Sequence, residues 1–113
     1  MHLVEHRLSA RVPVTLDALV QQPIDPATFV RLRNLSHYGA YAQTSVPIPR
    51  HRRVWIHLRL PGTRKPGVVR ATVVRADANG VGLEFDDYGP DVQGLLDRLL
   101  KHGGDRATVT GYR

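Results

Sequence analysis

Two short clusters of polar residues carry side chains that could bind a ligand. Arg7 and Arg11 place two guanidinium groups four positions apart near the start of the chain. Asn34, Ser36 and Gly39 combine an amide, a hydroxyl and a glycine within six residues. A guanidinium is planar and can donate two hydrogen bonds at once, to a phosphate or to the O6 and N7 acceptors of guanine. The first cluster therefore suits an anionic ligand that carries a flat base. No nucleophile with its base and orienting group is recognisable beside either cluster.

Each cluster also has an ordinary reading. Two arginines four positions apart on a solvated loop are usually only surface charge. Asn34, Ser36 and Gly39 form a combination that is common in turns, where short polar side chains bond their own backbone. The informative feature is that both clusters occur in one chain, ahead of several short predicted strands and one predicted helix.

Together, the two clusters resemble the PilZ domain, a bacterial sensor of cyclic di-GMP. That family is marked by R-x-x-x-R in an N-terminal loop and by (D/N)-x-S-x-x-G at a turn between strands. Residues 7–11 and 34–39 match these patterns in the expected order, and the likeness covers roughly residues 5 to 101. The ligand-binding residues that the resemblance implies are Arg7, Arg11, Asn34, Ser36, Gly39 and, for a phosphate contact at a strand end, Arg75.

The resemblance also implies what these side chains do. The two arginines would donate to guanine, stack on it and meet the phosphates. Asn34 and Ser36 would present polar groups to a base, although the amide offers one acceptor oxygen where the aspartate of many family members offers two. The glycine would allow the backbone to turn.

Apolar residues recur with a period of two up to residue 90, which is typical of half-buried strands. Prolines and glycines separate the alternating segments. We predict six strands, over residues 12–20, 29–35, 40–44, 54–60, 68–75 and 81–85, with the last two forming a hairpin. Closing such strands on themselves removes exposed edges, so we predict a six-stranded antiparallel β-barrel of the PilZ-like, split-barrel type.

After Pro90 the apolar period becomes that of an amphipathic helix, with valine and leucine recurring from Val92 to Leu100. We expect this helix to pack on the barrel and over Trp55. A chain of 113 residues suits one domain. The predicted organisation is a domain over 1–103, with a ligand loop at 5–11, a barrel at 12–86 and a helix at 90–102, then a flexible tail over 104–113.

Two details of the second cluster depend on strand geometry. On a regular strand Asn34 and Ser36 would point to the same side. Val30 and Leu32 would share that side, so we predict a bulge in this strand that separates the apolar residues from the polar ones. We also expect Gly39 to be required because its turn needs a positive φ.

Composition limits the function further. The formal charge of +6 favours an anionic partner without identifying it. The chain has no cysteine, so it has no disulfide and no thiolate metal site. Residues 2–6 match the H-x-x-E-H zinc pattern without helical context, and we expect neither a metal nor a cofactor. No apolar run approaches the ~20 residues of a membrane span and no signal peptide is recognisable, so we expect a cytoplasmic protein.

The expected function is that of a non-catalytic cyclic di-GMP receptor. Nucleotide would order the loop at 5–11 and change the surface presented to a downstream partner protein, whether one molecule or an intercalated pair binds. One alternative is a PilZ-like interaction module that binds no nucleotide, against which the retained motif residues argue. Another is a small basic barrel for single-stranded nucleic acid, which needs exposed aromatic side chains. With one tryptophan, four tyrosines and two phenylalanines, several of them expected in the core, the composition argues against nucleic acid.

Overall fold

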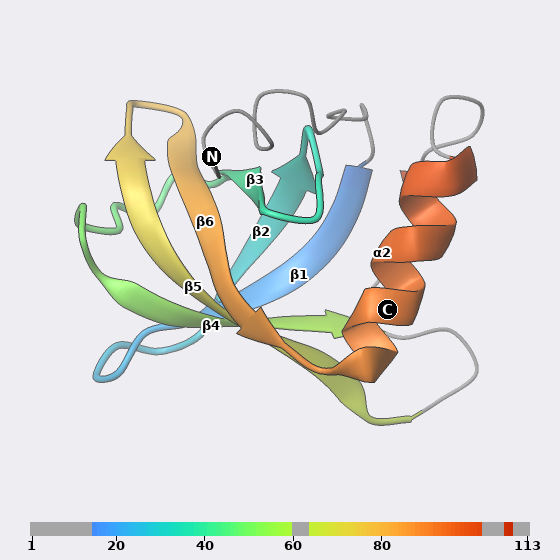
Figure 1. Cartoon of the computed structure of the whole chain (residues 1–113). Coiled ribbons are helices and arrows are strands. Elements are labelled where there is room, and N and C mark those ends of the chain that lie inside the picture. The colour runs from blue at the N-terminus through green and yellow to red at the C-terminus, as the bar shows by residue number, and fades with distance from the viewer. Residues whose placement is uncertain (1–14, 60–63, 103–107, 110–113) are drawn as a thin grey trace.

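The computed structural model describes residues 15–59, 64–102 and 108–109 (Figure 1). Its elements are, in chain order, β1 (Thr15–Gln21), β2 (Thr28–Arg33), β3 (Gly39–Gln43), β4 (Arg53–Arg59), β5 (Pro66–Ala76), β6 (Gly80–Tyr88), α2 (Pro90–His102) and β7 (Thr108–Val109). The first six strands follow the order predicted from the alternating pattern, and α2 spans the residues predicted for the helix. Residues 12–14 of the first predicted strand lie outside the described residues.

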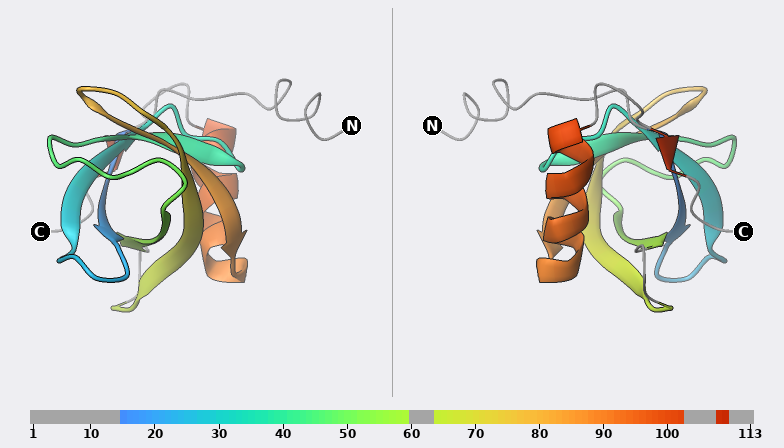
Figure 2. Two further views of the ribbon diagram at one scale, coloured as in Figure 1. Left: turned by 90° about the vertical axis from the view of Figure 1, so that its left-hand side faces the viewer. Right: turned by 90° about the vertical axis from the view of Figure 1, so that its right-hand side faces the viewer.

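Strands β1 to β6 form a closed antiparallel barrel. Around the sheet the neighbours run β2-β3-β6-β5-β4-β1, and β1 then pairs with β2, which closes the ring. Figure 2 shows the strands enclosing the core from two sides. The predicted six-stranded antiparallel barrel with a C-terminal helix is confirmed.

Alternation along each strand places the apolar side chains inside. In β4, Val54, Ile56 and Leu58 are buried, while the residues between them face outward. Burying an aliphatic side chain of this size contributes roughly 1.5–3 kcal/mol relative to leaving it exposed. The residues that recur with a period of two are therefore the ones that form the stabilising core.

Helix α2 lies outside the barrel, beside β5 and β6 (Figures 1 and 2). Its first residue, Pro90, suits the first position of a helix because the missing N–H would have no partner there. Val92, Leu95 and Leu96 are buried against the barrel core. Within the described ranges, no helix has the length and apolar character needed to cross a membrane.

The structure differs from the sequence-based prediction in the tail. Thr108 and Val109 form β7, which pairs in parallel with Thr15 and Leu16 of β1. We predicted residues 104–113 to lack regular structure because they carry no local pattern. A two-residue pairing with a strand some ninety positions earlier leaves no such pattern, so only the three-dimensional register reveals it. The other residues of this segment lie outside the described ranges.

The expected position of Trp55 is wrong. Trp55 is 38% exposed on the outer wall of β4, and no residue of α2 is among those that line the hollow beside it. With Pro23, Arg53 and Arg70 it lines a surface hollow of about 570 Å³, which Asp86 and Asp87 complete. Asp86 is the extra residue at a bulge in β6, so both neighbouring carboxylates face outward.

Candidate functional site

The structure describes four of the six residues that the sequence assigned to a ligand site. Asn34 and Ser36 lie in the connection between β2 and β3, Gly39 is the first residue of β3, and Arg75 lies near the end of β5. Arg7 and Arg11, with the whole loop at 5–11, lie outside the described residues. The geometry below therefore concerns the half of the site that the barrel carries.

Asn34 is the extra residue that breaks the alternation of β2. Its φ is 53°, in the left-handed region that asparagine tolerates better than most residues. Val30, Leu32 and Leu35 all face the core, which a regular strand cannot achieve with this spacing. The predicted bulge therefore lies at Asn34, and it turns this side chain outward.

The expectation that Asn34 and Ser36 point to one side is wrong, because the bulge separates them. Ser36 is buried, with 2% of its surface exposed. Its Oγ accepts hydrogen bonds from the backbone N–H groups of Tyr38, at 3.1 Å, and Gly39, at 3.2 Å. The N–H of Ser36 donates to the carbonyl of Gly39 at 2.9 Å. The hydroxyl thus stabilises the turn from inside and does not face solvent.

Gly39 is required for a different reason than the sequence suggested. Its φ lies outside the left-handed region, so the turn does not demand glycine on that ground. A Cβ at this position would lie 2.2 Å from the carbonyl oxygen of Leu83 on β6. The absence of a side chain lets β3 approach β6 closely at the point where the two strands begin to pair.

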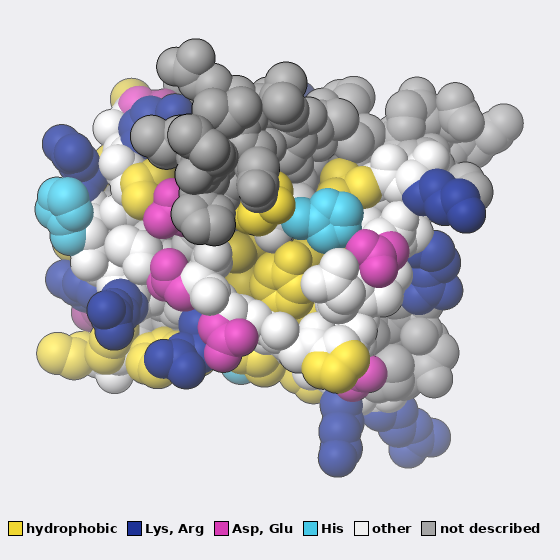
Figure 3. Space-filling view, viewed as in Figure 1, with side chains coloured by type: hydrophobic (Ala, Val, Ile, Leu, Met, Phe, Trp, Pro, Cys, Tyr) yellow, Lys and Arg dark blue, Asp and Glu magenta, His cyan; other side chains and the backbone are white. Residues whose placement is uncertain are grey.

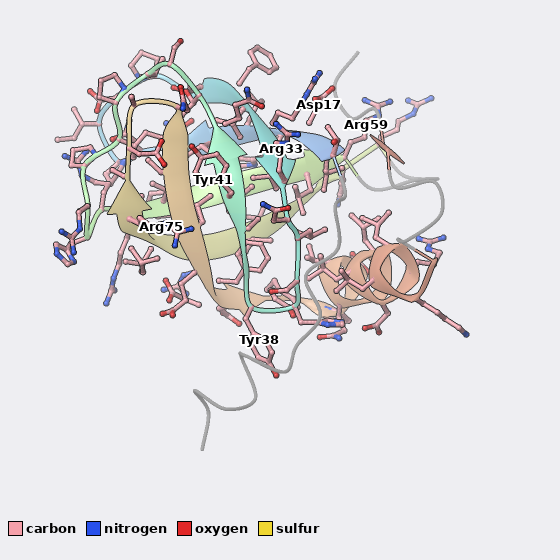
Figure 4. All side chains as sticks on the ribbon, turned by 90° about the horizontal axis from the view of Figure 1, so that it is seen from above. Asp17, Arg33, Tyr38, Tyr41, Arg59 and Arg75 are labelled. Carbon is pink, nitrogen blue, oxygen red and sulfur yellow. The ribbon has the colours of Figure 1, made fainter. Side chains whose placement is uncertain are left out.

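Arg75 lies on the outer wall, one strand away from Tyr41. Both residues pair with Gly82 of β6, so both side chains lie on the same face of the sheet (Figure 4). The hydroxyl of Tyr41 donates to Oδ1 of Asp77 at 2.8 Å. Arg33 of β2 pairs with Tyr41 from the other side. These neighbours were not predicted, because they come together only through the register of four strands.

These contacts determine which of Tyr41 and Asp77 is charged at neutral pH. Partial burial of the phenol, and then its bond to Asp77, raises the pKa of Tyr41 above its ordinary value. The backbone N–H of Asn79, and then the Tyr41 hydroxyl, lower the pKa of Asp77. At neutral pH the pair is therefore a neutral phenol donating to an ionised carboxylate, and the phenol is held in place.

The turn at residues 36–39 is also tied to helix α2. Nε2 of His37 lies 2.8 Å from Oδ1 of Asp97 on the helix. The hydroxyl of Tyr88 donates to the carbonyl of His37 at 2.9 Å. The bond from His37, and then that from Gln93, lower the pKa of Asp97, so the acceptor is ionised at neutral pH. His37 occupies a variable position of the motif, and no local signal in the sequence links it to residue 97.

Comparisons with known proteins agree with this geometry. A family model described as the PilZ domain matches residues 5–102. The structure resembles that of the Bacillus subtilis inhibitor of motility, MotI/DgrA, with a TM-score of 0.67 and 18% sequence identity. That similarity covers 87% of this chain and 51% of the other, so this chain spans about half the length of that protein. No curated protein matches the chain. Because the family model covers most of its residues, the chain belongs to the PilZ domain family.

Proposed function

We propose that this chain is a non-catalytic receptor for cyclic di-GMP in the cytoplasm. The observation that carries the proposal is the turn between β2 and β3, where Asn34 faces outward on a bulge. Ser36 and Gly39 maintain that turn from within, through hydrogen bonds and a close strand approach. An outward polar side chain on a hydrogen-bonded turn is suited to meeting the edge of a planar ligand, and Asn34 has that position in this proposal.

The residues divide into two groups in this proposal. Asn34 contacts a guanine, and Arg75 contacts the ligand from the barrel wall. Ser36 and Gly39 contribute by holding the turn, since the hydroxyl of Ser36 is buried. Arg7 and Arg11 supply the guanidinium groups that the family motif assigns to guanine and phosphate.

Signalling follows from the position of the turn. A nucleotide that bridges the N-terminal segment and the turn would act on His37, which connects the turn to α2 through Asp97 and to the end of β6 through Tyr88. The surface presented to a partner protein would then change. The size of that change is limited by how much more tightly the nucleotide binds the closed state than the open one.

Binding of the nucleotide is the first expected result. Titrating cyclic di-GMP into this chain in a calorimeter should give saturable heat, because both halves of the family motif lie within it. A rise in melting temperature with added nucleotide should accompany the heat. If neither signal appears at high micromolar nucleotide, the receptor proposal is wrong.

The role of Asn34 can be tested by changing it to aspartate. Asn34→Asp should maintain or strengthen binding, because a carboxylate offers two acceptors to the N1 and N2 hydrogens of guanine. Its charge near the phosphates opposes this gain. Aspartate also tolerates the left-handed backbone, so the melting temperature should stay unchanged. If calorimetry shows binding abolished in a folded variant, Asn34 donates its amide hydrogens and its assigned role must be reversed.

A second candidate function is supported by one observation. Trp55 is partly exposed beside Arg53 and Arg70, which is the combination on which a base of single-stranded nucleic acid could stack. On the face shown in Figure 3, however, the basic side chains drawn lie scattered around the rim with acidic ones between them, and they form no continuous track. Titration with a single-stranded oligonucleotide at two salt concentrations separates this function from the first, because phosphate contacts weaken steeply with salt.

A further inference from the structure

A row of four residues crosses the outer wall of the barrel beside the turn. Arg33 of β2 pairs with Tyr41 of β3, Tyr41 pairs with Gly82 of β6, and Gly82 pairs with Arg75 of β5. Directly paired residues in antiparallel strands project to the same face. The row therefore presents a phenol and two guanidinium groups on one surface (Figure 4), and Gly82 adds no side chain between them.

Two glycines of β6 let the phenol and one guanidinium lie low on the sheet. A Cβ at Gly80 would come within 2.9 Å of the Tyr41 ring and its hydroxyl oxygen. A Cβ at Gly82 would lie 3.1–3.3 Å from atoms of Arg75, including its guanidinium nitrogens. The phenol thus lies over Gly80 and the guanidinium over Gly82. A Cβ at Gly80 would also meet the backbone carbonyl of Ala42, and a Cβ at Gly82 would require the Arg75 side chain to shift by a few tenths of an ångström.

The phenol is also fixed in direction. Asp77 accepts the Tyr41 hydroxyl at 2.8 Å, and the same carboxylate oxygen accepts the N–H groups of Asn79 and Gly80 at 2.7 and 3.0 Å. The ring is therefore held by a turn that is itself hydrogen-bonded. A surface that is ordered before binding loses less conformational entropy when a ligand settles on it.

We infer that Tyr41 and Arg75 form a stacking platform for one guanine base of the nucleotide, with Arg33 beside it to meet a phosphate. This inference rests on the proposed function and adds residues that the family motif does not name. Aromatic rings and guanidinium planes are the protein groups on which bases stack, and here the two lie over Gly80 and Gly82 of the same strand.

The platform is continuous with the turn at Asn34. Arg33 immediately precedes Asn34, and Gly39 lies two residues before Tyr41 on the same strand. A ligand held at the turn therefore reaches the platform without leaving the wall. Glu84 pairs with Gly39 and is exposed, so a carboxylate acceptor borders the platform on the turn side. That acceptor favours guanine, which has donors on N1 and N2, over a base without them.

The closing experiment compares two substitutions of Tyr41 by calorimetry with cyclic di-GMP. Tyr41→Leu should weaken binding by roughly 5- to 150-fold, the range expected when one base loses its aromatic stacking partner. Tyr41→Phe keeps the ring and loses only the bond to Asp77, so it should retain most of the affinity. Gly82→Ala should weaken binding by less than Tyr41→Leu, because its methyl group lies 3.1–3.3 Å from Arg75 and shifts the guanidinium only slightly.

The matched control is Phe29→Leu, which removes an exposed aromatic ring from the outer wall away from the platform and should leave affinity unchanged. A direct readout of stacking is the guanine H8 resonance. It should move upfield on binding to the wild type and to Tyr41→Phe, and not on binding to Tyr41→Leu. If Tyr41→Leu proves unstable, the H8 shift in the wild type and in Tyr41→Phe still tests whether a base stacks on the ring at position 41.

The possible failures are distinct. If the wild type does not bind cyclic di-GMP, the proposed function and the platform are both overturned. If the wild type binds while Tyr41→Leu and Gly82→Ala bind as tightly, or if H8 does not shift, the platform alone is overturned and the receptor function stands.

Discussion

Replacing Arg7 or Arg11 with alanine is expected to weaken cyclic di-GMP binding by about tenfold or more. Truncating one partner of a desolvated charge pair costs ~2 to 5 kcal/mol, and partial exposure to solvent lowers that value. The melting temperature of the ligand-free protein should hardly change, since among the described residues the buried core is built from side chains between Leu16 and Leu96. Calorimetry and thermal melting of each variant measure the two quantities.

Lysine at either position serves as the sharper variant. It keeps the charge and loses the planar fork and the stacking surface, so Arg11→Lys should recover only part of the affinity. Arg59→Ala is the matched control, because it removes one exposed arginine of β4 and changes the net charge equally. Equal losses in Arg11→Ala and Arg59→Ala would mean that overall charge, and not the motif, governs binding.

Gly39→Ala and Gly39→Val are both expected to destabilise the barrel strongly without ligand. The new Cβ would lie 2.2 Å from the carbonyl oxygen of Leu83, so β3 must move away from β6 at the start of their pairing. Overpacking against a side chain costs about 1–3 kcal/mol, and a backbone neighbour yields less readily. We expect a fall in melting temperature on the order of 10 °C or more.

Gly94→Ala is the control for this effect. Gly94 is an interior position of α2, and among the described residues no group outside the helix's own backbone lies within 4 Å of a Cβ there. Alanine is a better helix former than glycine, so this variant should gain roughly 0.5–1 kcal/mol of stability. A Gly39→Ala protein that melts with the wild type would show that the strands separate at little cost, and the proposed reason for Gly39 would be wrong.

The fold could be predicted because its signals are local. Alternation in the segment from Val54 to Leu58 reflects one buried and one solvated face, and the spacing from Val92 to Leu96 reflects one buried stripe of a helix. Both patterns arise within a few residues and need no knowledge of the partner strand. The six barrel strands along the chain and the helix after them follow from these patterns, whereas β7 does not.

The candidate site was predicted less well, because its residues act through non-local geometry. Counting positions on a regular strand placed Asn34 and Ser36 together, and a single left-handed residue separates them. Gly39 was assigned to a turn, and its actual constraint is a carbonyl 44 positions later, at Leu83. The sequence singled out these residues, but the roles it suggested for Ser36 and Gly39 differ from those in the structure.

Non-local geometry also explains why the sequence did not indicate the row on the barrel wall or the bond between the turn and α2. Arg33, Tyr41 and Arg75 come from three strands and form a row only because β6, with its glycine, lies between β3 and β5. His37 and Asp97 are 60 positions apart. A bulge in β5, between Val73 and Arg75, sets the register that places Arg75 opposite Gly82, and no alternation rule anticipates it.

The bond between His37 and Asp97 has a consequence for the cell. It joins the turn to α2, and energetic coupling between two binding events is reciprocal. Under the proposed function, a nucleotide at the turn that changed the affinity of α2 for a partner protein would have its own affinity changed by that partner by the same factor. The concentration of cyclic di-GMP at which this domain responds would then depend on how much of the helix-binding partner is present. Two cells with the same chain and different amounts of partner would have different thresholds.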